Sequence, residues 1–353
     1  MTTLLLEIES ADNMETRADR MFVTSDWKRW IAENLLRGAP REELSTILIR
    51  EGFAEDLARL EVDTAASHPY VAAGQSLARQ VKKRDWFLHT RRIMEREHGS
   101  AEVERRQALP SENFHREYYA LNRPVIIENA ISDWPAITKW TPDYLREQCG
   151  TEQVEIQARR ESNPGYEIEK DAHRQSCQFG EFIEKVFFQG ASNDFYMTAS
   201  NANSNGIVLD KLWGDIPLPP AYAEVNGARD RTFLWVGPAG TVTPLHHDLT
   251  NNFMAQVVGR KRIRMVSPAN QPFVYNQRHC FSQVDVDDVD EQKFPLFKGV
   301  YVHDLILNPG ELLFLPVGWW HHVVALDVSI TITFTSLRGT NDFTAFYETY
   351  GEI

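Results

Sequence analysis

The feature that most constrains the fold is a series of short apolar segments in the second half of the chain, with turn residues between them. These segments are rich in β-branched and aromatic residues, and they are Phe195–Thr198, Thr232–Val236, Asn252–Val258, Arg262–Val266, Leu312–Leu315 and Ile330–Phe334. Such residues favour β-strands, and many short strands at hairpin spacing are typical of an all-β sandwich or barrel. A further buried strand is expected at Val125–Ile127. We therefore predict a mainly β fold for this region.

The first third of the chain has a different character and is predicted to be α-helical. Ser25 can cap a helix that ends at Gly38, and Pro40 suits the first turn of the helix that follows. Further helices are expected at 53–62, after Pro69 and at 82–98. We find no cluster of potential ligands in these helices, so catalysis is expected elsewhere.

The composition changes near Leu109-Pro110, where the helical periodicity ends. We predict three parts: a disordered N-terminus (1–23), a helical region (24–105) that either recognises a substrate or packs on the next domain, and a β-rich domain (106–353). No repeat of fixed period and no nucleotide-binding or helical metalloprotease motif is found.

Charge and cysteine content exclude several classes of protein. The 37 Lys+Arg and 50 Asp+Glu residues give a net charge of −13, which disfavours nucleic acid as a partner. Three scattered cysteines do not make a disulfide scaffold, and this favours a reducing compartment. No segment approaches the ~20 apolar residues of a membrane span. We expect a soluble, cytoplasmic protein that has no membrane partner.

A His-x-Asp sequence at residues 246–248 is the strongest chemical signal. In a strand, residues i and i+2 face the same side, so His246 and Asp248 should converge while His247 points away. One imidazole and one carboxylate form two thirds of the 2-His-1-carboxylate site that binds non-haem Fe(II). The third ligand should come from a distant strand, and the segment that ends in His321 and His322 is the candidate. The periodicity alone does not choose between these two histidines.

Lys261 gives a second signal. With a period of two it shares the apolar face of its strand with Ile263 and Met265, whereas Arg262 and Arg264 share the other face. An ammonium on an apolar face is costly unless an anion pairs with it. A lysine at a strand start can also reach water along its side chain. Beside an iron site, an inward lysine is what a dicarboxylate co-substrate would require.

These motifs resemble those of the JmjC-type (cupin-like) protein hydroxylases, a family of Fe(II)/2-oxoglutarate-dependent oxygenases. The pattern is most similar to the arginyl hydroxylase group and to the asparaginyl hydroxylase of hypoxia-inducible factor. The matching text covers Gly240–Arg262, Ser282–Asp285, Phe294-Pro295, Asn308–Pro316 and Trp320-His321, within a similarity from about Leu109 to Leu337. The resemblance implies a double-stranded β-helix (jelly-roll, cupin/JmjC barrel) as the fold of a catalytic domain.

Carried over by position, the resemblance implies that His246, Asp248 and His321 bind Fe(II), which selects His321 over His322. It also implies a pocket for 2-oxoglutarate. The pocket residues are Lys261, Thr243 and Tyr196 at the distal carboxylate of 2-oxoglutarate, and Asn252 near its chelating end.

The implied activity is that of a dioxygenase. It uses dioxygen to hydroxylate an amino-acid side chain in a peptide or protein and releases succinate and CO2. Trp235, Trp319 and Trp320 are interpreted as core residues that can also keep such a site dry.

The chain departs from the asparaginyl enzyme at its substrate contacts, where it has Cys280-Phe281, Thr333 and Leu337, so an asparaginyl target is not implied. The sequence also offers no counterpart of that enzyme's C-terminal dimerisation helices, and the oligomeric state stays open. The acidic segment Asp285–Glu291 is either a solvated loop or a surface that favours a basic peptide. Three alternative functions remain: a lysine demethylase, a small-molecule hydroxylase, and a cupin-like metal-binding protein without turnover.

Overall fold

The computed structural model describes residues 22–97, 102–199 and 202–343. Most of the N-terminus that is predicted to be disordered lies outside these residues. The chain divides into two compact units, Met1–Thr90 and Arg91–Ile353. Within the described residues, no helix combines the length and the apolar character needed to cross a membrane.

The first unit consists of helices, as predicted, and has its own core. Its helices are α1 (Ser25–Arg37), α2 (Arg41–Arg50), α3 (Glu55–Ser67) and the start of α4 (Pro69–Glu97). The core residues include Trp27, Ile31, Leu35, Leu44, Leu48, Phe53 and Val62. Gly38 ends α1 with a φ of 95°, a left-handed conformation that glycine adopts without steric cost.

Three details of the predicted helices are wrong. Ser25 is the first helical residue and not the cap, because Thr24 precedes the helix and its side chain makes no capping hydrogen bond. Pro40 lies just before α2 rather than in its first turn. The separate helices expected after Pro69 and at 82–98 are one continuous helix, α4. No proline follows Pro69 in this segment, and its one glycine, Gly74, costs about 1 kcal/mol relative to alanine, too little to end a helix.

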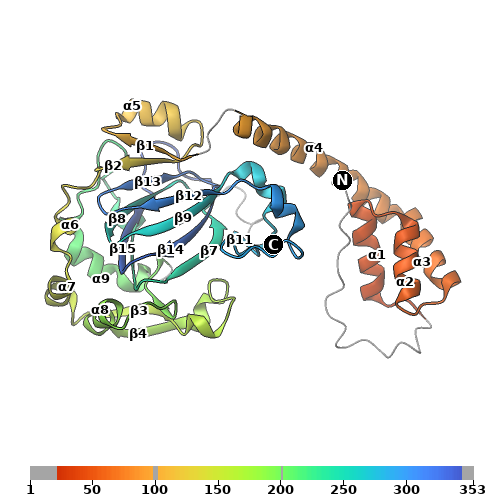
Figure 1. Cartoon of the computed structure of the whole chain (residues 1–353), viewed down its shortest axis with the longest axis horizontal. Coiled ribbons are helices and arrows are strands. Elements are labelled where there is room, and N and C mark those ends of the chain that lie inside the picture. The colour runs from red at the N-terminus through yellow and green to blue at the C-terminus, as the bar shows by residue number, and fades with distance from the viewer. Residues whose placement is uncertain (1–21, 98–101, 200–201, 344–353) are drawn as a thin grey trace. The chain divides into compact units, whose positions relative to one another are not determined.

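Two six-stranded sheets form a β-barrel in the second unit (Figure 1). The first sheet runs in the order β1 (Glu104–Gln107), β2 (Val125–Glu128), β13 (Leu312–Leu315), β8 (Asn252–Val258), β15 (Ser329–Phe334) and β6 (Thr232–Gly237). The second runs β10 (Asn276–Arg278), β11 (Phe281–Ser282), β7 (Val242–His247), β14 (Trp320–Ala325), β9 (Lys261–Val266) and β12 (His303–Leu307). Apart from the pairs β1–β2 and β10–β11, neighbouring strands within each sheet are not consecutive in the chain, as in a jelly roll. The mainly β prediction with a helical N-terminus is confirmed.

A small third sheet and several helices complete this unit. The sheet has the order β4 (Arg174–Gln178), β3 (Gln153–Ala158) and β5 (Phe195–Tyr196). The helices are α5 (Ser111–Phe114), α6 (Pro135–Lys139), α7 (Pro142–Cys149), α8 (Phe179–Phe188) and α9 (Ala202–Leu212), with a π-helical turn at His115–Tyr119. Short 3-10 turns lie at Arg160–Ser162, Lys170–His173, Trp213–Asp215, Arg229–Arg231, Pro268–Phe273 and Pro295–Gly299.

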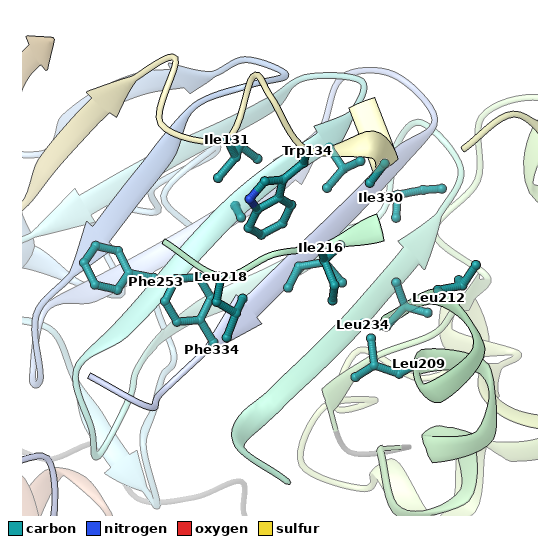
Figure 2. Packing of buried hydrophobic residues seen from close by; sticks show 14 of the residues in the cluster. Ile131, Trp134, Leu209, Leu212, Ile216, Leu218, Leu234, Phe253, Ile330 and Phe334 are labelled. Atoms are coloured by element: carbon teal, nitrogen blue, oxygen red, sulfur yellow. The ribbon is translucent and has the colours of Figure 1, made fainter. Parts of the chain in front are cut away.

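Strands β2, β13 and β8 in the middle of the first sheet are buried on both faces, which explains why they are largely continuous apolar runs. Phe253, Ile330 and Phe334 point to an outer layer with Trp134 and Leu209, as Figure 2 shows. The opposite face meets the second sheet in a smaller cluster of Ile126, Met254, Ile263, Met265, Leu307, Leu313, Leu315, Trp319 and Val323. Full burial of one such side chain contributes about 1.5–3 kcal/mol. The packing on both faces of the first sheet therefore holds in fixed positions the side chains that project between the two sheets.

Candidate functional site

His246 and His321 come from adjacent strands and lie directly opposite each other. They are cross-strand partners in the β7–β14 ladder, and their ring centroids are 4.0 Å apart. Asp248 follows the end of β7. One ligand atom from each of the three residues lies within 4.8 Å of the other two. The structure therefore brings together the three residues that the sequence predicts as a ligand set.

Hydrogen bonds orient the two imidazoles. His246 Nδ1 lies 2.8 Å from the carbonyl oxygen of Pro244, and His321 Nδ1 lies 3.0 Å from that of Trp319. A carbonyl oxygen only accepts, so each Nδ1 donates to the backbone, and each Nε2 is the ring nitrogen left to face a metal. Burial, together with the neighbouring His246 ring, lowers the pKa of His321 to about 3, so His321 is neutral at pH 7.

The neighbouring histidines point away from the cavity. The His247 ring packs against Trp320 with a centroid separation of 4.7 Å. His322 Nε2 lies 3.6 Å from Asp287 Oδ2 on the other face of the sheet. Strand alternation thus separates His246 from His247 as expected. It also places His321, and not His322, in the cavity.

Thr243 reaches the same cavity only because β7 is irregular. By strict alternation Thr243 and His246 would face opposite sides of the sheet. The ladder with β14 shifts register between His321 and Val323, and this shift places two β7 residues, Pro244 and Leu245, against one on β14. A bulge of this kind is one of the few places where a strand tolerates proline.

Lys261 occupies the other end of the cavity. Its side chain is buried, and its Nζ donates a hydrogen bond to the Tyr196 hydroxyl at 3.2 Å. Among the described residues, no carboxylate lies within ion-pair distance of this ammonium. Burial therefore lowers the pKa of Lys261 to about 7, and burial also raises the pKa of Tyr196. A buried ammonium without an anionic partner is costly, and an anionic ligand bound next to it would supply the missing partner.

All seven predicted site residues line one cavity of about 340 Å³. Its lining is Tyr196, Ala199, Phe233, Trp235, Thr243, His246, Asp248, Thr250, Asn252, Met254, Lys261, His321, Val323, Thr333 and Thr335. Asn252 Nδ2 donates to Asp248 Oδ2 at 3.2 Å, which orients that carboxylate. Asn252 Oδ1 is buried and has no hydrogen-bond partner within the described part of the chain.

The three tryptophans have different roles. Trp235 lines the cavity and donates from Nε1 to Thr333 Oγ1 at 2.9 Å. Trp319 and Trp320 lie outside the lining: Trp319 donates to the carbonyl oxygen of Asn122 at 2.8 Å, and Trp320 packs in a separate apolar cluster. Core packing is therefore the role of these two residues, in agreement with their primary interpretation.

Two further residues lie near the site. Phe281, singled out from the sequence only as a departure from the asparaginyl enzyme, stacks on His246 with a centroid separation of 5.7 Å. Arg160, which sequence reasoning did not single out, is buried against Tyr196. Arg160 lies in a 3-10 turn, where no periodicity signals burial. In the acidic segment, Asp285, Asp287 and His322 lie close together, but Arg264 forms an ion pair with Asp287 and already supplies a cation.

Comparison with known proteins agrees with this architecture. A family model described as a cupin-like domain matches residues 110–335. The chain is 34% identical over 229 residues to "Lysine-specific demethylase 8" of Xenopus tropicalis, covering 63% of this chain and 50% of that protein. It is 36% identical over 238 residues to "Lysine-specific demethylase JMJ30" of Arabidopsis thaliana, covering 66% and 54%. It is 34% identical over 257 residues to "JmjC domain-containing protein D" of Dictyostelium discoideum, covering 65% and 55%.

The chain spans about half the length of these curated relatives. The match to the family model lies on the part of the chain that carries the barrel. The fold, the extent of the family match and the relatives agree with the resemblance found in the sequence. The chain belongs to the family of proteins with a cupin-like domain, and it is similar to JmjC-type proteins within that family.

Proposed function

We propose that this protein is an Fe(II)- and 2-oxoglutarate-dependent dioxygenase that hydroxylates an amino-acid side chain in a peptide or protein. The observation that carries the proposal is the cavity itself. It holds the candidate ligands His246, Asp248 and His321 together with the buried Lys261, whose amine has no carboxylate partner among the residues that the structure describes. A metal-binding protein without turnover has no need of Lys261 and Tyr196.

The donor set fits Fe(II). Two imidazoles and one carboxylate are the ligands of the facial triad, which leaves other metal positions open for small ligands. The Nδ1 hydrogen bonds of both histidines already direct Nε2 away from the backbone. The unpaired Oδ1 of Asn252, next to Asp248, offers a polar contact to a group bound at the metal.

The opposite end of the cavity fits the distal carboxylate of 2-oxoglutarate. Lys261 Nζ and the hydroxyls of Tyr196 and Thr243 all line this cavity and can donate to one anion. An anion there would raise the pKa of Lys261 from its low value and fix the ammonium in its charged form.

When bound, Fe(II), 2-oxoglutarate and dioxygen would couple oxidation of 2-oxoglutarate to succinate and CO2 with insertion of oxygen into a C–H bond. The residues of the chain bind and orient these groups. Phe233, Trp235 and Met254 give the cavity an apolar wall that excludes water, so that the oxidation is directed to the bound substrate.

Lysine demethylation is a second candidate, because two relatives are named lysine-specific demethylases. The two outcomes differ in product. Hydroxylation adds one oxygen to the substrate, whereas demethylation removes a methyl group as formaldehyde. We further propose that the substrate is a peptide or protein and that the helical region (24–105) contributes to its recognition.

Succinate release tests the proposal. Protein purified without oxygen is given Fe(II), 2-oxoglutarate and air, first alone and then with peptide mixtures. Wild type should form succinate and Asp248→Ala should not, while His247→Ala, which alters the neighbouring histidine outside the cavity, should retain turnover. If wild type and Asp248→Ala release the same amount of succinate, the proposed site is wrong. Mass spectrometry of the peptides then distinguishes a gain of oxygen from loss of a methyl group.

A further inference from the structure

A buried arginine lies next to the co-substrate end of the cavity but outside its lining. Arg160 is 1% exposed and begins the 3-10 turn Arg160–Ser162. Its guanidinium donates to Asn193 Oδ1 at 2.8 Å, to Glu167 Oε1 at 2.8 Å and to the carbonyl oxygen of Val242 at 2.7 Å. A buried ion pair with several directed hydrogen bonds adds little net stability and is better suited to fixing geometry.

The guanidinium contacts two aromatic rings. Its Cζ lies 4.2 Å from the ring centroid of Tyr166 and 5.2 Å from that of Tyr196. Lys261 donates to the hydroxyl of the same Tyr196. The Tyr196 ring is also closely packed against β6, since a Cβ on Gly237 would lie 2.6 Å from Tyr196 Cδ2. The ring therefore has little freedom to move while Arg160 stays in place.

The same arginine also fixes the start of β7. The carbonyl oxygen of Val242 accepts from Arg160 and, at 3.1 Å, from the Tyr166 hydroxyl, while Val242 N donates to Asn193 Oδ1 at 2.9 Å. Val242 directly precedes Thr243, whose side chain enters the cavity through the bulge. Two of the three anion donors, Tyr196 and Thr243, thus depend on one guanidinium for their position.

We propose that Arg160 is a positioning residue for the dicarboxylate co-substrate. By holding Tyr196 and the start of β7, it keeps both hydroxyls where they join Lys261 around a distal carboxylate. This inference rests on the proposed function. Because Arg160 acts only at this end of the cavity, its loss should affect the dicarboxylate and not the metal or the 2-oxo acid group.

The test compares two 2-oxo acids by calorimetry on Mn(II)-loaded full-length protein. 2-Oxoglutarate has the distal carboxylate, and 2-oxobutyrate lacks it. Arg160→Gln should bind 2-oxoglutarate at least about tenfold more weakly than wild type, with Mn(II) and 2-oxobutyrate affinities within about twofold. Asp215→Asn is the matched control, because Asp215 is a buried acceptor for Lys139, Trp140 and Tyr144 outside the cavity lining. It should change stability but not the ratio of the two affinities.

Arg160→Lys keeps the charge, but its single ammonium cannot serve Asn193, Glu167 and Val242 together. It should show a smaller loss that is again selective for 2-oxoglutarate, and it decides the question if Arg160→Gln does not fold. An equal loss for both 2-oxo acids, or no loss, would overturn the positioning role. If wild type itself fails to bind 2-oxoglutarate, the proposed function fails, and the inference fails with it.

Discussion

Replacing Lys261 with methionine should stabilise the protein in the absence of ligands, by an amount that depends on pH. Burial lowers the pKa of Lys261 from 10.5 to about 7 in the folded state. Between these two values the unfolded chain binds more protons than the folded one, so the free energy of unfolding of wild type should rise with pH. Lys261→Met removes the titrating group and should remove this part of the pH dependence.

The magnitude follows from the two pKa values. One pKa unit corresponds to about 1.4 kcal/mol, so the penalty for the buried lysine grows from zero above pH 10.5 to on the order of 5 kcal/mol at pH 7. In the variant, the Tyr196 hydroxyl loses the hydrogen bond from Lys261, which costs about 1 kcal/mol. Lys261→Met should therefore be more stable than wild type by a few kcal/mol near pH 7, and the advantage should vanish towards pH 10.

Urea unfolding of the full chain in chelator at pH 7.5, 8.5 and 9.5 measures this difference. In a separate experiment without chelator, the unfolding transition of the barrel is identified as the one whose urea midpoint shifts when Mn(II) and 2-oxoglutarate are added. Lys211→Met is the control, because Lys211 is 41% exposed, pairs with Glu152 and has a raised pKa. The difference in the free energy of unfolding between Lys211→Met and wild type should not fall as the pH rises over this range. The reasoning would be refuted if the difference in the free energy of unfolding between Lys261→Met and wild type did not change with pH. It would also be refuted if Lys261→Met were less stable than wild type at pH 7.5.

Three further predictions follow from the site and its supports. Asp248→Ala should bind Mn(II) at least about 100-fold more weakly with little change in far-UV circular dichroism, and unchanged affinity by calorimetry would remove Asp248 from the ligand set. His321→Ala should likewise abolish metal binding while His322→Ala keeps it, and the reverse result would show that the other histidine is the ligand. Gly259→Ala should cost more than about 3 kcal/mol in urea unfolding, because its φ is +67° and a Cβ would lie 2.0 Å from the carbonyl oxygen of Val328. Gly227→Ala, with a φ of +71° and no atom within 4 Å, should cost only about 1 kcal/mol, and equal costs would contradict the role of the close contact.

The strands and the shared face of His246 and Asp248 were predictable because they rest on local periodicity and on residue chemistry. The period of two separates His246 from His247 and puts Lys261 on the apolar face, and both placements agree with the structure. The choice of His321 over His322 needed the family resemblance. In the structure, His321 rather than His322 enters the cavity because His321 pairs with His246 across the β7–β14 ladder, and this pairing joins residues that are distant in the sequence.

The features that were missed depend on register and on irregular backbone. The bulge that turns Thr243 into the cavity lies at Pro244, and proline inside a strand was the available signal for it. Arg160 is buried by tertiary contacts to Tyr166, Tyr196 and Val242, and no pattern within its own turn predicts them. The two helices predicted after Pro69 and at 82–98 join into α4, and no proline lies between them to end the first one.

The cross-strand pairing of His246 with His321 has a consequence for the order of folding events. The two imidazoles meet only after the chain between them, which includes β8, β9 and β12, has been accommodated in the sheets. Closing such a long loop is entropically costly, so contacts of this sequence separation form slowly. We therefore expect the proposed metal site to appear late, when the barrel closes, and its metal ion to be acquired by a chain that is already folded. Metal added during refolding should then raise the final stability without accelerating the rate of folding.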